Sequence, residues 1–247
     1  MKPAIALWRA EVVRLVRDMR FVVLTLGLPV IFYVIFIDEA GPAARIDGTA
    51  WASYFMVSMA AFGVVGSSVS ALSVRLSAER KGGWVRWLRT TPLSSTGYAL
   101  AKVMTQLTLV LLDILVIFLL AHFYQHVDLA ASRWLAIGAW LWLASLPFAA
   151  LGVLIGMFGT AAQVLGTLVY MLLSLLGGLW TPISQLPTAL QNVARWLPTY
   201  RYGAPAWSIL AGGSVPLRDV AILFVYAIIF VAAAAIVQRR VDAQASG

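Results

Sequence analysis

The sequence predicts an all-α membrane protein in which six helices cross a bilayer. Its composition is the first observation, since 62% of the 247 residues are hydrophobic and only 11% are charged, unlike a soluble domain. The second is that apolar residues gather in blocks of bilayer length. The third is that most lysines and arginines stand at the ends of these blocks, as topology signals do. Nucleic-acid binding is not expected, because the net charge of +8 is not gathered into one basic patch.

Residues 1–20 are predicted to form an amphipathic helix that lies on the membrane surface. Apolar side chains recur at helical spacing, and basic residues carry most of the polar surface. Burial of the apolar side chains and attraction to anionic headgroups hold such helices at an interface. The apolar positions are Ile5, Trp8, Val12, Leu15 and Met19.

Six apolar blocks have about the 20 residues that a helix needs to cross a bilayer. They cover residues 21–37, 51–74, 98–121, 134–158, 161–180 and 220–237. Of the 18 lysines and arginines, 13 fall on one side of the resulting topology, the side that holds both termini. Because basic residues accumulate on the cytoplasmic side, both termini are expected in the cytoplasm.

Residues 181–217, before the last span, are predicted to form a partly immersed helical hairpin on the outer side. The first helix is bounded by prolines and is too short to cross a bilayer. Its apolar face consists of Leu186, Leu190, Val193, Ala194 and Leu197. A second short helix is expected over residues 202–210, before Gly212 and Gly213 interrupt it. Such interrupted backbone is tolerated at membrane depth where protein shields it.

Residues 75–94 form the long polar run between two apolar blocks and hold the densest group of basic residues. Leu76, Trp84, Trp87 and Leu88 can share one face of a short helix, which Pro92 then ends. This amphipathic pattern leaves two interpretations open. The segment is either an interfacial loop anchored by tryptophans or a docking helix that enters a groove on a soluble partner.

The motif E-R-x-x-G at residues 79–83, followed by Leu88 and by T-P-L-S at residues 91–94, resembles the segment between the second and third spans of ABC-2-type transporter permeases. Trp84 and Arg86 depart from the family pattern, which more often has a small hydroxylated residue and an acidic residue there. Further landmarks of the family occur in the same order before the last span. They are Gly177-Gly178, Pro182, Leu186-Pro187, Leu197-Pro198 and Gly212, so the resemblance covers nearly the whole chain.

The resemblance implies one ABC-2-type transmembrane domain over residues 1–247, in which residues 75–94 are the coupling segment that rests on an ATPase. The positions that it assigns to this contact are Glu79, Arg80, Gly83, Trp84, Trp87, Leu88, Arg89 and Pro92. It also implies a bacterial inner-membrane exporter with two permease subunits, identical or different, above two cytoplasmic ABC ATPases. ATP and magnesium would bind to the ATPases, and this chain would bind no cofactor.

The predicted function is therefore a permease subunit that forms the path for a hydrophobic or amphipathic substrate, such as a drug, an antibiotic or a lipid. The chain has no G-x-x-x-x-G-K-[ST] loop, so ATP hydrolysis would come from a partner. It also has no H-E-x-x-H or G-x-S-x-G motif, and it is not expected to be an enzyme by itself. The alternative is a non-transporting scaffold that recruits a cytoplasmic partner, or an ion-coupled carrier, which would need more buried ionisable residues.

Asp113 is an acidic residue well inside a predicted span, where a charge is costly unless it is paired or neutralised. Gln106 lies two turns away on the same helix face, so the two residues form a candidate polar seam. Asp113 has either a functional role or a structural hydrogen bond to a neighbouring helix. Candidate path-lining residues, each explained better by lipid exposure or core packing, are Phe55, Met59, Phe62, Leu168, Met171 and Leu172.

Metal and thiol chemistry are not expected from this sequence. The chain has no cysteine, which excludes disulfides and thiolate zinc sites. His122 and His126 stand four residues apart, a spacing that can place two imidazoles on one helix face. No third ligand is evident, so we interpret these histidines as polar residues at the membrane boundary.

Overall fold

The computed structural model describes residues 2–41, 44–46, 48–83 and 94–245. Its fold confirms the predicted all-α class, apart from a short antiparallel hairpin of β1 (Arg45–Ile46) and β2 (Thr49–Ala50). Within these residues, four helical stretches are long and apolar enough to cross a membrane, namely Trp51–Lys81, Gly97–Tyr124, Ala131–Leu176 and Leu217–Arg239. These stretches overlap the predicted second to sixth spans, while the first predicted span lies in another helix, α2.

The helices of the described residues follow one another along the chain with short connections. They are α1 (Lys2–Arg17), α2 (Met19–Ala40), α3 (Trp51–Val65), the π-helix η1 (Gly66–Ala71), α4 (Leu72–Lys81), α6 (Ser95–Tyr124), α7 (Ala131–Leu143), α8 (Leu146–Ile155), the 3-10 helix η2 (Gly156–Ala161), α9 (Ala162–Leu176), the 3-10 turn η3 (Ile183–Gln185), α10 (Thr188–Ala194), α11 (Pro198–Leu210) and α12 (Leu217–Ala245).

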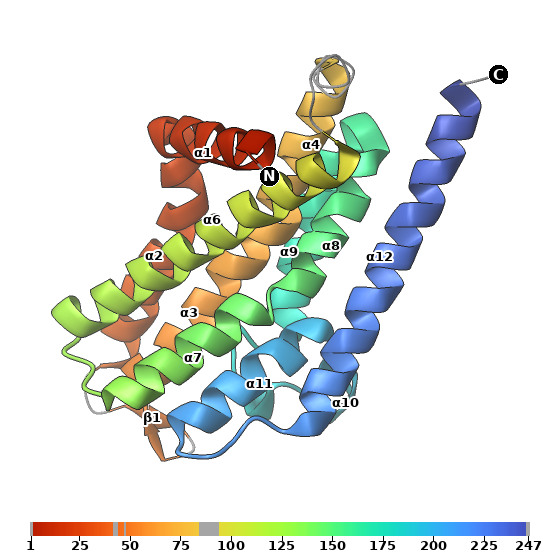
Figure 1. The fold of residues 1–247 in the computed structure, drawn as a ribbon. Coiled ribbons are helices and arrows are strands. Elements are labelled where there is room, and N and C mark those ends of the chain that lie inside the picture. The colour runs from red at the N-terminus through yellow and green to blue at the C-terminus, as the bar shows by residue number, and fades with distance from the viewer. Residues whose placement is uncertain (1, 42–43, 47, 84–93, 246–247) are drawn as a thin grey trace.

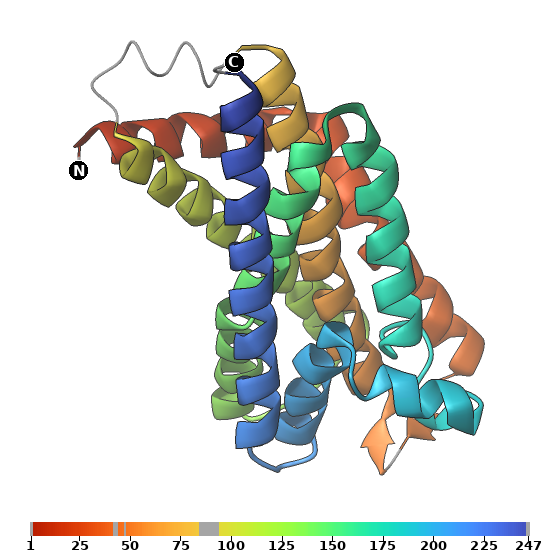
Figure 2. The same cartoon turned by 90° about the vertical axis from the view of Figure 1, so that its right-hand side faces the viewer.

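The long helices form a bundle with two distinct ends. Figure 1 shows α1 lying across one end, beside the last turns of α4 and near the end of α12. The view in Figure 2 places the same segments together, so both termini lie at this end, which we call the terminal end. The β-hairpin, α10 and α11 lie at the opposite end (Figures 1 and 2), which we call the hairpin end.

Helix α3 occupies the centre of the bundle because it is apolar on all sides. Every residue from Ser53 to Val65 is buried, as expected for a helix without a polar face. Helices α2, α6, α7, α9 and α11 all contact it. Helix α12 is the opposite case, since only 11% of its most apolar window is buried, which leaves a long apolar surface facing outward.

The predicted surface helix is shorter than expected and has two apolar sides. It ends at Arg17, and α2 starts at Met19. Leu15 is 5% exposed against the bundle, whereas Ile5 and Met19 are 50% and 65% exposed. The single apolar face predicted from periodicity is therefore divided, because α1 packs along α6 with one side and faces outward with the other.

The predicted fourth span is interrupted in its middle. Helix α7 ends at Leu143, and α8 begins at Leu146 with Pro147 in its first turn. Pro147 has no backbone N–H to continue the hydrogen-bond pattern of α7. The hydroxyl of Ser145 donates to the carbonyl of Trp142 at 2.7 Å and closes the end of α7. The interruption follows from the proline, which the hydropathy pattern alone did not reveal.

Helix α8 and η1 cross at very short range because glycines stand at the crossing. A Cβ added to Gly152 would lie 2.0 Å from the carbonyl oxygen of Ser68. A Cβ added to Gly156 would lie 3.0 Å from the Cβ of Leu76. The chain then turns back at Gly159, whose φ of 58° is unfavourable for residues with a side chain. These small residues let the helix backbones approach closely, as the sequence pattern suggested.

At the hairpin end, the structure has the two short helices that were predicted before the last span. The second of them, α11, begins at Pro198, four residues earlier than expected. Pro198 was predicted only to bound the first helix, yet proline also suits the first position of a helix, where its missing N–H would be unpaired anyway. Helix α11 packs against α3, α7 and α12.

Candidate functional site

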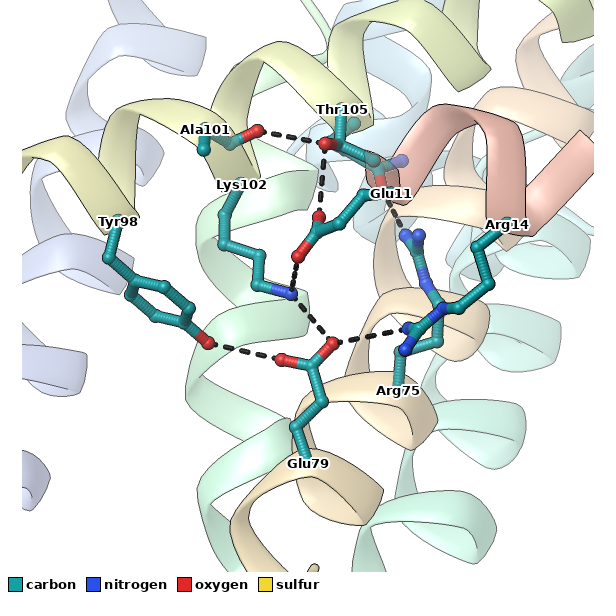
Figure 3. Close-up of polar contacts among 9 residues, drawn as sticks. Glu11, Arg14, Arg75, Glu79, Tyr98, Ala101, Lys102 and Thr105 are labelled. Carbon is teal, nitrogen blue, oxygen red and sulfur yellow. Dashed lines mark hydrogen bonds and ion pairs between the residues drawn. The ribbon is translucent and has the colours of Figure 1, made fainter. Parts of the chain in front are cut away.

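Three charged side chains from three different helices meet at the terminal end of the bundle. Lys102 of α6 lies between Glu11 of α1 and Glu79 of α4 (Figure 3). Its Nζ is 2.5 Å from Glu11 Oε1 and 2.6 Å from Glu79 Oε1. The side chains of Lys102, Glu11 and Glu79 are only 13%, 8% and 8% exposed. The three residues form a largely buried ion-pair cluster that joins α1, α4 and α6.

The second oxygen of each carboxylate also has a partner. The hydroxyl of Tyr98 donates to Glu79 Oε2 at 3.1 Å, and the hydroxyl of Thr105 lies 3.0 Å from Glu11 Oε2. Arg14 adds a looser contact of 3.6 Å to Glu79 Oε1. Buried ions are tolerated when their remaining lone pairs and protons are satisfied in this way. Figure 3 shows all of these groups converging on the two carboxylates.

The local structure explains how each charge reaches the cluster. On α1, Ala4, Glu11 and Leu15 all face the bundle and are buried, so Glu11 belongs to the inner face of its helix. On α6, Ala101 and Thr105 are buried beside Lys102. The cavity bounded by the cluster is about 10 Å³, room for at most one water. The cluster therefore holds helices together and leaves no space for a substrate.

A chain of polar contacts continues from the cluster toward the bundle centre. Arg75 Nη2 donates to Gln106 Oε1 at 2.7 Å, and Gln106 Nε2 donates to the hydroxyl of Ser68 at 3.1 Å. The next residue, Ser67, donates to Asp113 Oδ2 at 2.5 Å. Gln106 and Asp113 thus contact neighbouring serines of η1 and do not bond to each other. Asp113 is 3% exposed, and its bond to Ser67 is the kind of partner that a structural role requires.

Among the described residues, no group of three or more histidines and acidic residues lies close enough to hold a metal ion. His122 and His126 are both exposed. The chemistry available at the terminal end is therefore the making and breaking of ion pairs between helices.

Comparison with known proteins explains the arrangement of the bundle. Residues 4–206 match the sequence profile described as ABC-2 type transporter. The chain belongs to this family. The chain is also 35% identical to the protein named "Putative transport permease YvfS" of Bacillus subtilis (strain 168), over 237 residues that cover 95% of this chain and 96% of that relative. It is thus an ABC-2 permease, a transport subunit that resides in a membrane.

In this ABC-2 permease, the predicted coupling segment is described in part. Glu79 belongs to the ion-pair cluster, and Arg80 Nη2 donates to Gln238 Oε1 of α12 at 2.8 Å. Gly83 follows α4 with a φ of 69°. The remaining candidates, Trp84, Trp87, Leu88, Arg89 and Pro92, lie outside the described residues. The two described ends of the segment are the last turn of α4 and Ser94, whose hydroxyl accepts from the N–H of Gly97 at the start of α6.

The candidate path-lining residues of the ABC-2 permease fall into two groups. Phe55, Met59 and Phe62 of α3 are at most 1% exposed, and the ring of Phe62 stacks on that of Tyr170 with centroids 4.7 Å apart. On α9, Leu168 and Leu172 are 54% and 56% exposed, and Met171 is half-buried. The structure does not bring the two groups together around a shared cavity.

Sequence reasoning missed Glu11 as a site residue and treated Lys102 as a topology signal. Trp8, Glu11 and Leu15 follow one another at helical spacing, so an acidic residue stands in line with apolar ones on α1. This irregularity is the signal that could have identified Glu11. Its partners are 91 positions away in the case of Lys102, which no local pattern reveals.

Proposed function

We propose that this permease is the membrane subunit of an ATP-driven bacterial exporter for hydrophobic or amphipathic molecules. Membership of the ABC-2 family supports a partnership with ATPases. The chain itself has no phosphate-binding loop that could hydrolyse ATP. ATP and magnesium would accordingly bind to two cytoplasmic ATPases, below two permease subunits.

The proposed topology has six spans in the inner membrane and both termini in the cytoplasm. The spans are α2, α3 with α4, α6, α7 with α8, α9, and α12. The two chain ends and the described ends of the coupling segment share the terminal end (Figure 1). Most lysines and arginines of the chain lie toward this end in the sequence order, which supports a cytoplasmic position for it.

The observation that carries the mechanism is the ion-pair cluster at the end of α4. A push on residues 75–94 by an ATPase would first reach α4, whose Glu79 is bound to Lys102 of α6. Through the same Lys102 the motion would reach Glu11 of α1. The link is short and its polar groups are paired, so α1, α4 and α6 would move as one unit. A rigid unit of three helices can transmit a displacement toward the membrane centre.

The test is co-purification of the permease with the ATPase encoded beside its gene, followed by ATPase assays. Leu88→Asp should dissociate or uncouple the complex, because a charge replaces the apolar anchor of the docking face. Glu79→Arg should uncouple it by breaking the cluster. The matched control is Asp128→Arg, the same change of charge at an exposed residue; it should leave both binding and ATPase activity intact.

Failure of any ATPase to bind the native permease would contradict the proposal. The alternative would then be an ion-coupled carrier or a membrane scaffold. A carrier would require further buried ionisable residues of the kind represented by Asp113. A scaffold would retain a partner that does not hydrolyse ATP, and mass spectrometry of the co-purified proteins would identify it.

A further inference from the structure

A basic pocket lies at the hairpin end, at the far side of the bundle from the ion-pair cluster. Its volume is about 470 Å³, and its lining residues come from the segment around α10, from α11 and from the start of α12. This size is within the range of small-molecule sites. The lining consists of Asn192, Arg195, Trp196, Tyr200, Arg201 and Arg218, so three guanidinium groups and no carboxylate line it.

One of the three arginines is buried and held in place. Arg201 is 7% exposed, and its Nη1 donates to Asp219 Oδ1 at 2.6 Å. Its Nε is also buried but has no hydrogen-bond partner in the part of the chain that the structure describes. A buried donor without an acceptor is costly. An anion in the pocket would supply an acceptor for this atom.

The other two arginines are exposed at the opening of the pocket. Arg195 follows α10, and Arg218 stands in the first turn of α12. The Cζ of Arg218 lies 5.8 Å from the centroid of the Trp196 ring, a cation–π contact that orients the guanidinium. The carbonyl of Trp196 accepts from the hydroxyl of Tyr226 at 2.8 Å. The pocket thus combines a fixed inner donor with two outer cations, an arrangement suited to an oxyanion.

The surroundings of the pocket indicate which anion it fits. Arg218 begins a stretch of α12 that is long and apolar enough to cross a membrane, so the pocket opens at the depth of the lipid headgroups. Next to it, Val220 and Phe224 are 38% and 65% exposed, an apolar track for an acyl chain. Trp196 is 61% exposed, as is common for tryptophans at a membrane boundary.

We propose that this pocket binds the phosphate-bearing headgroup of an amphiphile such as an anionic phospholipid. The phosphate lies among Arg195, Arg201 and Arg218, where bidentate guanidinium contacts favour it. The remaining volume accommodates the polar part of the headgroup, and the acyl chains follow the exposed face of α12. This site is independent of the coupling mechanism, because it lies at the other end of the bundle and requires no ATPase.

The test is calorimetric titration of the purified full chain, in a phosphate-free neutral detergent, with dihexanoyl phosphatidylglycerol and separately with inorganic phosphate. Arg195→Gln and Arg218→Gln should each weaken phosphatidylglycerol binding about tenfold, the usual effect of losing one charge-assisted hydrogen bond. Arg201→Lys keeps a cation beside Asp219 and should fold, yet it removes the Nε donor and should also weaken binding. The control is Arg133→Gln, the same change at an exposed arginine outside the pocket.

The expected result is binding of phosphatidylglycerol that the three pocket variants weaken and Arg133→Gln does not. Equal binding of inorganic phosphate, with the same dependence on the variants, would overturn the headgroup and assign the pocket to free phosphate. Loss of affinity in all four variants alike would overturn the site, because it would show general attraction to positive charge. Native-like binding in Arg195→Gln and Arg218→Gln would overturn it as well.

Discussion

At the scale of single residues, the feature that distinguishes this chain is a lysine shared by two buried glutamates. A lone carboxylate at the position of Glu11 would be unfavourable on the inner face of α1, because burial removes its hydration. Lys102 offsets this for Glu11 and Glu79 together. Tyr98 and Thr105 then occupy the outer oxygens. The stability of each residue in the cluster therefore depends on the others, and single substitutions should have large effects.

Lys102→Met should lower the free energy of unfolding by about 3–5 kcal/mol, because two buried carboxylates lose their cation. The measurement is unfolding of the purified chain in mixed micelles with increasing sodium dodecyl sulfate. Lys81→Met is the matched control, since Lys81 is exposed on the last turn of α4, and it should change stability little. Adding Glu11→Gln and Glu79→Gln to Lys102→Met should restore part of the loss. Equal stability of the two lysine variants would contradict a stabilising cluster.

At the scale of elements, contact between helices is controlled by where side chains are absent. The crossing of η1 and α8 depends on Gly152, where a Cβ would overlap the backbone of Ser68. Backbone atoms cannot move aside as the end of a flexible side chain can. The same crossing lies beside Ser67 and Ser68, which bond to Asp113 and Gln106. Any displacement of η1 from α8 would therefore also disturb the polar contacts of α6.

Gly152→Ala should destabilise the chain by about 3 kcal/mol, the upper part of the range for overpacked sites. Gly27→Ala is the matched control, because the nearest atom to its new Cβ would be a Val23 methyl at 3.9 Å. In the interior of α2 this change should stabilise the helix by up to about 1 kcal/mol. Thermal unfolding in detergent measures both variants. A Gly152→Ala protein as stable as Gly27→Ala would show that the crossing can relax.

At the scale of the whole molecule, the two ends of the bundle have different chemistry. The terminal end holds the ion-pair cluster and the described ends of the coupling segment (Figures 1 and 3). The hairpin end holds the arginine-lined pocket. In the proposed topology the first end meets ATPases in the cytoplasm and the second faces the outer headgroups. This assignment of sides is open to direct measurement.

The absence of native cysteine makes that measurement simple, since a single introduced cysteine is then the only reactive thiol. Ala78→Cys at the terminal end and Ser214→Cys at the hairpin end both replace exposed residues. In intact cells stripped of any outer membrane, a membrane-impermeant maleimide should label Ser214→Cys. It should label Ala78→Cys only after the inner membrane is opened. The reverse pattern would invert the topology and place both termini outside.

Much of the fold could be predicted because it depends on local sequence. The apolar blocks, the short helices before the last span and the turn at Gly159 all follow from hydrophobic runs and from proline and glycine positions. The interruption at Ser145 was missed although Pro147 is visible in the sequence, since hydropathy averages over single prolines. The apolar face predicted for α1 was wrong in part, because packing on α6 divides it.

By itself the sequence determined that this protein is a helical membrane protein, that its basic residues favour one side, and that it carries the landmarks of an ABC-2 permease. These properties reside in composition, periodicity and short motifs, which need no knowledge of neighbours. Only the tertiary structure decided that Glu11 and Glu79 share Lys102, and that Arg195, Arg201 and Arg218 surround one pocket. The reason is physical, because a charge becomes buried or clustered through helices that pack together from distant parts of the chain.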